Sequence, residues 1–161
     1  MDDMAFINDY LNRYKQSLFE TDVSDKLIEM KQKLLKIKKE GNKVIIAGNG
    51  GSAAISSHVT VDFTKQGGIR TVNFNESDLI TCFANDYGYE NWVAKAIEFY
   101  GDKGDLIILI SSSGNSKNMV NAARIAKKLT MEVVTFTGFK ADNPLKQEGD
   151  LNFWLDSKAY N

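Results

Sequence analysis

The stretch VIIAGNGGSAAISSHVTVDF, residues 44–63, carries the pattern that decides the fold. It begins with an apolar run, continues through closely spaced glycines and reaches the single histidine of the chain, His58. A strand that ends in glycines and leads into a helix is typical of an anion-binding turn in an α/β protein. The block GNGGSA, residues 48–53, also fits the G-x-G-x-x-A pattern of dinucleotide-binding folds. Two ligands are therefore to be weighed, a dinucleotide and a single phosphate group.

Strand-like and helix-like segments alternate over the rest of the chain. Near-continuous apolar runs predict parallel strands, covered on both faces, at 43–48, 69–74, 105–111, 132–138 and 151–156. Helical spacing predicts helices between them, at 52–65, 77–86, 90–100 and 116–129. We therefore expect an α/β fold, a three-layer sandwich with a five-stranded parallel sheet of the flavodoxin-like kind.

Two amphipathic helices are expected before the first strand, within residues 4–40. Apolar side chains recur at helical spacing over residues 4–19, and a second helix is expected from a cap at Ser24 to Gly41. These apolar faces need a partner surface, which is either the sheet of the same chain or a helical bundle between subunits. We interpret residues 1–161 as one domain, with its α/β core at 43–156.

The composition argues against a nucleic-acid or membrane protein. Lys and Arg number 20 against 21 Asp and Glu, so the chain lacks the basic surface that general nucleic-acid binding requires. No apolar run approaches the ~20 residues of a membrane span. The single cysteine, Cys82, suits a reducing compartment, and the N-terminus MDDMAFINDY is not a signal peptide. We expect a cytoplasmic protein.

A second polar turn follows the third expected strand. In ISSSGNS, residues 110–116, serines crowd a turn that precedes a helix. The start of a helix offers unpaired N–H groups and partial positive charge, glycine permits close approach, and hydroxyls add neutral donors. Because ligands bind at the carboxyl ends of such strands, two turns of this kind predict one phosphate site. A dinucleotide would also call for an acidic residue at the end of the second strand, where only the late Glu76 follows, so we expect no nucleotide cofactor.

His58 and Asp62 are four residues apart in the helix after the first turn, so they share one helix face. Such a pair can hold a divalent metal such as zinc. A carboxylate in a partly desolvated cleft is also suited to act as a base, because burial raises its pKa. The alternative is that the histidine is an ordinary packed or exposed residue and the aspartate a surface carboxylate.

Taken together, GNGGSA, the H…D pair after it, FANDYGY at 83–89 and ISSSGNS resemble the sugar isomerase (SIS) domain family, and within it the phosphoheptose isomerases. The resemblance implies an aldose–ketose isomerase that converts sedoheptulose 7-phosphate to D-glycero-D-manno-heptose 7-phosphate through an enediolate. His58 and Asp62 would be catalytic and would bind zinc. The assembly would be a homotetramer, a dimer of dimers, with the N-terminal helices in its central bundle and the sites at subunit interfaces. The implied substrate-binding residues are Asn49, Gly50, Gly51, Ser52, Asn85, Asp86, Ser111, Ser112, Ser113 and Ser116.

The sequence departs from the family pattern at three places. Asp62 stands where the family usually has glutamate, and Gln66 stands where it has a basic residue. The family also continues into a C-terminal helix with a second catalytic and metal-binding histidine, which would begin near LDSKAYN at 155–161. A shorter carboxylate displaces the base, and displacement of about 1 Å can cost roughly a hundredfold in rate. The alternative is a non-catalytic SIS module that binds a phosphosugar or a protein partner as a regulatory tetramer.

Overall fold

The computed structural model describes residues 2–157, and within them five parallel strands form one sheet. The strand order is β2-β1-β3-β4-β5. The predicted α/β fold with a five-stranded parallel sheet is confirmed. The strand order is flavodoxin-like and differs from the 3-2-1-4-5-6 order of dinucleotide-binding folds. The strands are β1 (Val44–Gly48), β2 (Thr71–Asn73), β3 (Leu106–Ser111), β4 (Glu132–Thr137) and β5 (Leu151–Trp154).

Helices cover both faces of the sheet. Successive side chains of a strand point to opposite faces, and here both sets are apolar and buried. Ile107 and Leu109 of β3 belong to the core on one face, and Leu106 and Ile108 to the core on the other. The first face is covered by α4 (Ser77–Tyr87), α5 (Trp92–Tyr100), α6 (Lys117–Lys128) and α7 (Pro144–Glu148). The second is covered by α2 (Ser24–Glu40) and α3 (Gly51–Lys65).

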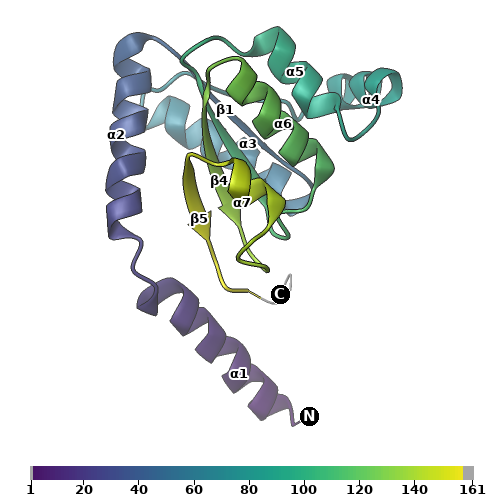
Figure 1. Cartoon of the computed structure of the whole chain (residues 1–161). Helices are drawn as coiled ribbons and strands as arrows, with labels where there is room; N and C mark the ends of the chain where they lie inside the picture. The colour runs from purple at the N-terminus through teal and green to yellow at the C-terminus, as the bar shows by residue number, and fades with distance from the viewer. Residues whose placement is uncertain (1, 158–161) are drawn as a thin grey trace.

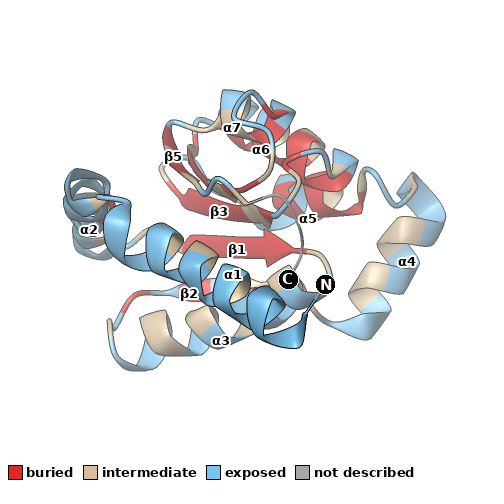
Figure 2. Cartoon of the chain, turned by 90° about the horizontal axis from the view of Figure 1, so that it is seen from below, coloured by how far each residue is buried: buried red, intermediate tan, exposed pale blue. Residues whose placement is uncertain are grey.

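The N-terminal helix α1 (Asp3–Lys15) extends away from this body (Figure 1). It continues through a π-helical turn, η1 (Gln16–Glu20), and buries none of its residues. Figure 2 shows exposed residues along nearly its whole length. Helix α2, in contrast, buries Met30 and Ile37 against the sheet. The sheet of the same chain is therefore the partner surface of α2 and not of α1.

The ends and lengths of some helices and strands differ from the sequence-based expectations, because local hydrogen bonds determine where an element begins or ends. The expected cap at Ser24 is wrong, because Ser24 is already helical and its N–H donates to Asp22 Oδ1 at 2.9 Å. Gly41 does end α2, with a left-handed φ of 75°. Strand β2 is half the expected length, and α7 was not expected at all. The five residues of α7 are too few for a periodic pattern, and the helix starts from a side-chain cap at Asn143.

Within residues 2–157, no helix combines the length and the apolar character needed to cross a membrane.

Candidate functional site

The first turn is built from backbone groups. Gly48 ends β1 so close to the first turn of α3 that an added Cβ would lie 2.6 Å from the Cβ of Ser52. Gly50, with φ of 55°, starts α3 without any side-chain cap. The N–H of Ser52 donates to Asn49 O, whereas those of Gly50 and Gly51 have no acceptor in the described chain. The turn therefore offers two free N–H groups at a helix start, which suits an anion.

The second turn is built from hydroxyl groups. Ser111 is buried at the end of β3, and its hydroxyl donates to Ser116 Oγ at 3.0 Å. Ser116 starts α6 without using its side chain as a cap. Ser113 Oγ accepts from the N–H of Asn115 at 3.2 Å. The single proton of the Ser111 hydroxyl is used in its bond to Ser116, whereas Ser113 Oγ and Ser116 Oγ only accept and keep their own O–H groups, which are neutral donors suited to a phosphate.

A third loop holds the serine turn in place. The N–H of Gly138 donates to Ser112 O at 2.9 Å, and the N–H of Leu145 donates to Gly114 O at 3.0 Å. Gly114 has φ of 64°, and a Cβ there would overlap the side chain of Asn143. Asn143 is 2% exposed and donates to Thr137 Oγ1 at 3.1 Å. The serine turn thus takes its shape from the end of β4 and the cap of α7.

The two turns lie side by side at the carboxyl ends of β1 and β3. These strands are neighbours, with Gly48 paired to Ile110. The Asn49 and Asn118 amides then join in a reciprocal pair. Asn49 Nδ2 donates to Asn118 Oδ1 at 3.0 Å, and Asn118 Nδ2 donates to Asn49 Oδ1 at 2.8 Å. The hydroxyl of Tyr89, from the segment after α4, also donates to Asn49 Oδ1, at 3.2 Å. The two turns are therefore adjacent at one end of the sheet and joined by side-chain hydrogen bonds.

Asn85 and Asp86 lie on the exposed part of α4. Asn85 Nδ2 donates to Asp86 Oδ1 at 2.9 Å, and the Cys82 thiol donates to Asp86 Oδ2 at 3.7 Å. The Asp86 carboxylate and, to a smaller extent, burial raise the pKa of the Cys82 thiol, which keeps it protonated. No hydrogen bond in residues 2–157 links Asn85 or Asp86 to either turn. The residue of FANDYGY that reaches the site is Tyr89.

His58 and Asp62 form a pair on α3, with Nε2 and Oδ2 3.6 Å apart. Their side chains are 81% and 50% exposed. They lie about 10 and 16 Å along the helix axis from Gly51, at 1.5 Å per residue. An imidazole and a carboxylate suit zinc in type, but zinc takes three or four protein ligands. The described residues contain no cluster of three His, Cys, Asp or Glu side chains, so one chain does not supply a complete zinc site there.

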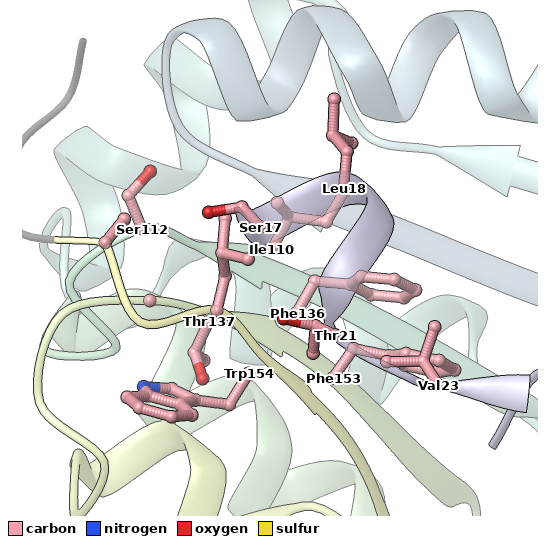
Figure 3. Close-up of a pocket in the computed structure, with 13 residues that line it drawn as sticks. Ser17, Leu18, Thr21, Val23, Ile110, Ser112, Phe136, Thr137, Phe153 and Trp154 are labelled. Carbon is pink, nitrogen blue, oxygen red and sulfur yellow. The ribbon is translucent and has the colours of Figure 1, made fainter. Parts of the chain in front are cut away.

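A cavity of about 410 Å³ lies on the α2–α3 face, below the serine turn (Figure 3). Its walls come from η1 and from the carboxyl ends of β3, β4 and β5. Ser112 of the serine turn lines the cavity, and the other walls are largely apolar and aromatic. The apolar and aromatic lining residues include Leu18, Val23, Ile110, Phe136, Phe153 and Trp154.

Sequence reasoning overlooked Asn118, Tyr89 and Asn143. A signal for Asn118 was present, because it is a polar residue inside the otherwise apolar buried stripe of α6. Tyr89 lies within a motif already singled out. Asn143 precedes the single proline of the chain, a position that favours a helix cap followed by Pro at the first helical residue.

Comparisons with known proteins agree with this geometry. The SIS domain family matches residues 7–138. A phosphoheptose isomerase of Fusobacterium nucleatum is 38% identical over 133 residues, which cover 80% of this chain and 68% of that protein. One of Histophilus somni is 34% identical over 145 residues, covering 80% and 74%. The solved structure of a phosphoheptose isomerase from Francisella tularensis has a TM-score of 0.89 at 25% identity and covers 99% of this chain and 88% of that one. The chain therefore belongs to the SIS domain family.

Proposed function

We propose that this chain is an aldose–ketose isomerase of a phosphorylated sugar, with sedoheptulose 7-phosphate as its substrate. The observation that carries the proposal is the pairing of two anion-binding turns at the carboxyl ends of β1 and β3. It agrees with the phosphoheptose isomerases that resemble this chain at 34–38% identity. Those relatives favour an enzyme over the alternative of a non-catalytic SIS module.

The phosphate is assigned to the two turns. Free backbone N–H groups of Gly50 and Gly51 and the hydroxyls of Ser113 and Ser116 supply uncharged donors. Donors fixed in this way bind an anion without a paired cation, because the helix starts carry partial positive charge. Binding at the phosphate fixes the position of the distant end of the sugar, where the reaction takes place.

The proton transfers are assigned to Asp62 and His58. Asp62 removes a proton from C1 of the ketose, and the electron pair forms an enediolate with negative charge on the C2 oxygen. His58 transfers the C1 hydroxyl proton to that oxygen, and Asp62 returns its proton to C2, which leaves an aldehyde at C1. Atoms and charge balance without a redox partner. Positioned acid–base groups of this kind contribute typically ~10²–10⁴-fold in rate.

We further propose that a second copy of the chain completes the site, in a homotetramer. The acid–base pair lies two to three helical turns from Gly51, and no hydrogen bond in the described chain links it to either turn. Helix α1 buries no residue, and its large apolar side chains Phe6, Leu11 and Tyr14 are each about half exposed. A helix with this much exposed apolar surface needs a partner. A tetramer would give α1 one and would bring the pair of one subunit to the turns of another.

The activity is tested with purified protein and sedoheptulose 7-phosphate, following formation of the aldose. Wild-type protein should convert the substrate, and Ser116→Ala should raise KM. To test the shared site, inactive Asp62→Asn chains are unfolded, mixed with inactive Ser113→Ala/Ser116→Ala chains and refolded. Recovered activity would support a site built from two chains. No turnover by the wild-type chain at any substrate concentration would reject the isomerase proposal.

The assembly is tested by light scattering on wild-type protein and two α1 variants. Leu11→Asp places a charge on the apolar side of α1 and should lower the molar mass from that of a tetramer. Asn12→Asp adds the same charge at an exposed position on the other side of that helix and should leave the mass unchanged. A wild-type monomer would contradict the assembly proposal.

We propose a zinc ion only at a site where the His58–Asp62 pair supplies two ligands and groups outside the described part of one chain supply the others. Elemental analysis of the purified protein, before and after chelator treatment, tests this. The expected result is about one zinc per chain, lost in His58→Ala. Metal-free protein with full activity would reject the zinc proposal.

A further inference from the structure

We infer that Asn118 is a positioning residue that fixes the side-chain amide of Asn49, so that Asn49 presents one N–H donor, and no acceptor, to the sugar phosphate. The ligand atom that Asn49 meets must then be an oxygen that accepts a hydrogen bond, and not a hydroxyl that donates one. This inference rests on the proposed function for its kinetic test, and on the hydrogen-bond geometry alone for its spectroscopic test.

The orientation of Asn118 is set by the backbone. Asn118 is 2% exposed, and its side-chain oxygen accepts at 3.1 Å from the N–H of Met119, which also donates to Ser116 O at 3.0 Å. A backbone N–H can only donate, so the atom of Asn118 beside it must be oxygen. That oxygen also faces Asn49, which must therefore turn its nitrogen toward it. The assignment of both amides follows from one fixed backbone donor.

The capacity of the Asn49 amide is then nearly used up. An asparagine side chain has two N–H donors and two acceptor sites on its oxygen. Both acceptor sites of Asn49 are occupied, by Asn118 Nδ2 at 2.8 Å and by the Tyr89 hydroxyl at 3.2 Å. One of its N–H groups is occupied by Asn118 Oδ1 at 3.0 Å. What remains, within the described chain, is the second N–H of Asn49.

The place of the remaining N–H makes it useful. Asn49 is half-buried between the two turns, immediately before the free N–H groups of Gly50 and Gly51. An amide held from behind is already oriented for the phosphate oxygen in front of it, so less order has to be imposed on this donor when the ligand binds. We assign Asn118 no contact with the ligand, because it is 2% exposed and its oxygen and one of its N–H groups already meet Asn49 and Met119.

A double-mutant cycle tests the inference. Asn118→Leu keeps the volume of the side chain and removes its hydrogen bonds, so it should lower kcat/KM roughly tenfold or more. In the Asn49→Ala background it should change kcat/KM less than about twofold, because its partner is already gone. Additive losses in the two backgrounds would overturn the inference, since they would show that Asn118 acts through the fold and not through Asn49.

Asn42 supplies the matched control. It is a half-buried asparagine whose Nδ2 donates to Lys103 O at 3.0 Å. It lies at the amino ends of the strands, whereas the turns lie at their carboxyl ends. Asn42→Leu should lower thermal stability but leave kcat/KM unchanged in both backgrounds. If Asn42→Leu lowers kcat/KM as much as Asn118→Leu, general loosening of the fold explains the result and the inference fails.

Nuclear magnetic resonance of the side-chain amides gives a test that needs no activity. In wild-type protein one N–H of Asn49 should exchange slowly with water and the other rapidly, and in Asn118→Leu both should exchange rapidly. The signals are assigned from their loss in Asn49→Ala. A wild-type chain without isomerase activity would reject the proposed function while this measurement still decides the inference. Rapid exchange of both Asn49 protons in the wild type would reject the inference alone.

Discussion

The two faces of the sheet are covered to different degrees, and the two binding turns lead into opposite faces. Helix α6, after the serine turn, buries half of its residues and packs against α5 and α7. Helix α3, after the glycine turn, buries only Ser56, and Ile55 and Val61 remain 52% and 54% exposed. The cavity beside Phe136 and Phe153 lies on this same less covered face (Figure 3).

Under the proposed function, the serine-turn half of the phosphate site would stand on the more covered face and the acid–base pair on the less covered one. The serine turn and the Asn118 amide stand on a helix that the core holds fixed, which suits a phosphate site that must keep its geometry. The candidate acid–base pair stands on a helix with an open outer side, where a second copy can approach. If this comparison is correct, substitutions on α6 and its turn should alter stability or affinity, whereas those on α3 should alter turnover.

The largest expected effect is on the open side, at Asp62. Asp62→Asn removes the proposed base and should lower kcat about 10²–10⁴-fold. The free energy of unfolding should change by less than about 0.5 kcal/mol, because the side chain is half exposed. Steady-state kinetics and thermal unfolding measure the two effects. The exposed carboxylate of Asp25 on α2 is the control, since Asp25→Asn should change neither. An unchanged kcat in Asp62→Asn would remove the base from α3 and with it the comparison.

A pair of glycine substitutions compares the two turns directly. Gly114→Ala should cost about 3 kcal/mol of stability, because Cβ adds strain at a positive φ and overlaps Asn143. Gly51→Ala should cost less than about 1 kcal/mol, because a Cβ there meets nothing within 4 Å. Chemical denaturation of both variants measures the contrast. Equal costs would show that the two turns are equally confined.

A smaller effect is expected at the hydroxyl that starts α6. Ser116→Ala removes one donor to the phosphate and should weaken phosphosugar binding about tenfold, or roughly 1.4 kcal/mol. Calorimetric titration with sedoheptulose 7-phosphate measures it. Ser77→Ala, at the exposed start of α4, makes the same change outside the site and should leave the dissociation constant unchanged. If Ser116→Ala binds as tightly as wild type, the phosphate does not lie against α6.

The layered fold could be predicted from the sequence because its signals are local. Apolar runs marked every strand within a few residues, and the glycines and serines marked both turns. That the two turns meet at one end of the sheet could be predicted from the strand ends, but the amide pair that joins them could not, because Asn49 and Asn118 are 69 positions apart. The bracing of Gly114 by Asn143 depends on a close approach of two loops, which no periodic pattern records. The exposure of α3 depends on what covers its outer side, and one sequence does not state this.

The smallest effect concerns how α2 is attached to the less covered face, where an ion pair adds to the few side chains that α2 buries. Lys33 Nζ lies 2.6 Å from Glu132 Oε2 at the start of β4. Burial raises the pKa of Glu132, but hydrogen bonds from Lys33 and Lys36 bring that pKa below its ordinary value. The hydrogen bond to Glu132 also raises the pKa of Lys33.

Glu132→Gln should therefore lower the free energy of unfolding by about 1 kcal/mol at pH 7. The stabilisation by Glu132 is complete above its unfolded pKa of ~4.3 and is lost as the pH falls through its lower folded pKa. The stabilisation by Lys33 is complete below its unfolded pKa of ~10.4 and is lost as the pH rises through its higher folded pKa. Urea unfolding at pH 7 and pH 3 measures the effect, and the wild-type advantage should shrink at pH 3. Glu98→Gln breaks a more exposed pair on α5 and should cost only about 0.3 kcal/mol. An equal loss at both pH values for Glu132→Gln would mean that packing, and not charge, attaches α2 to β4.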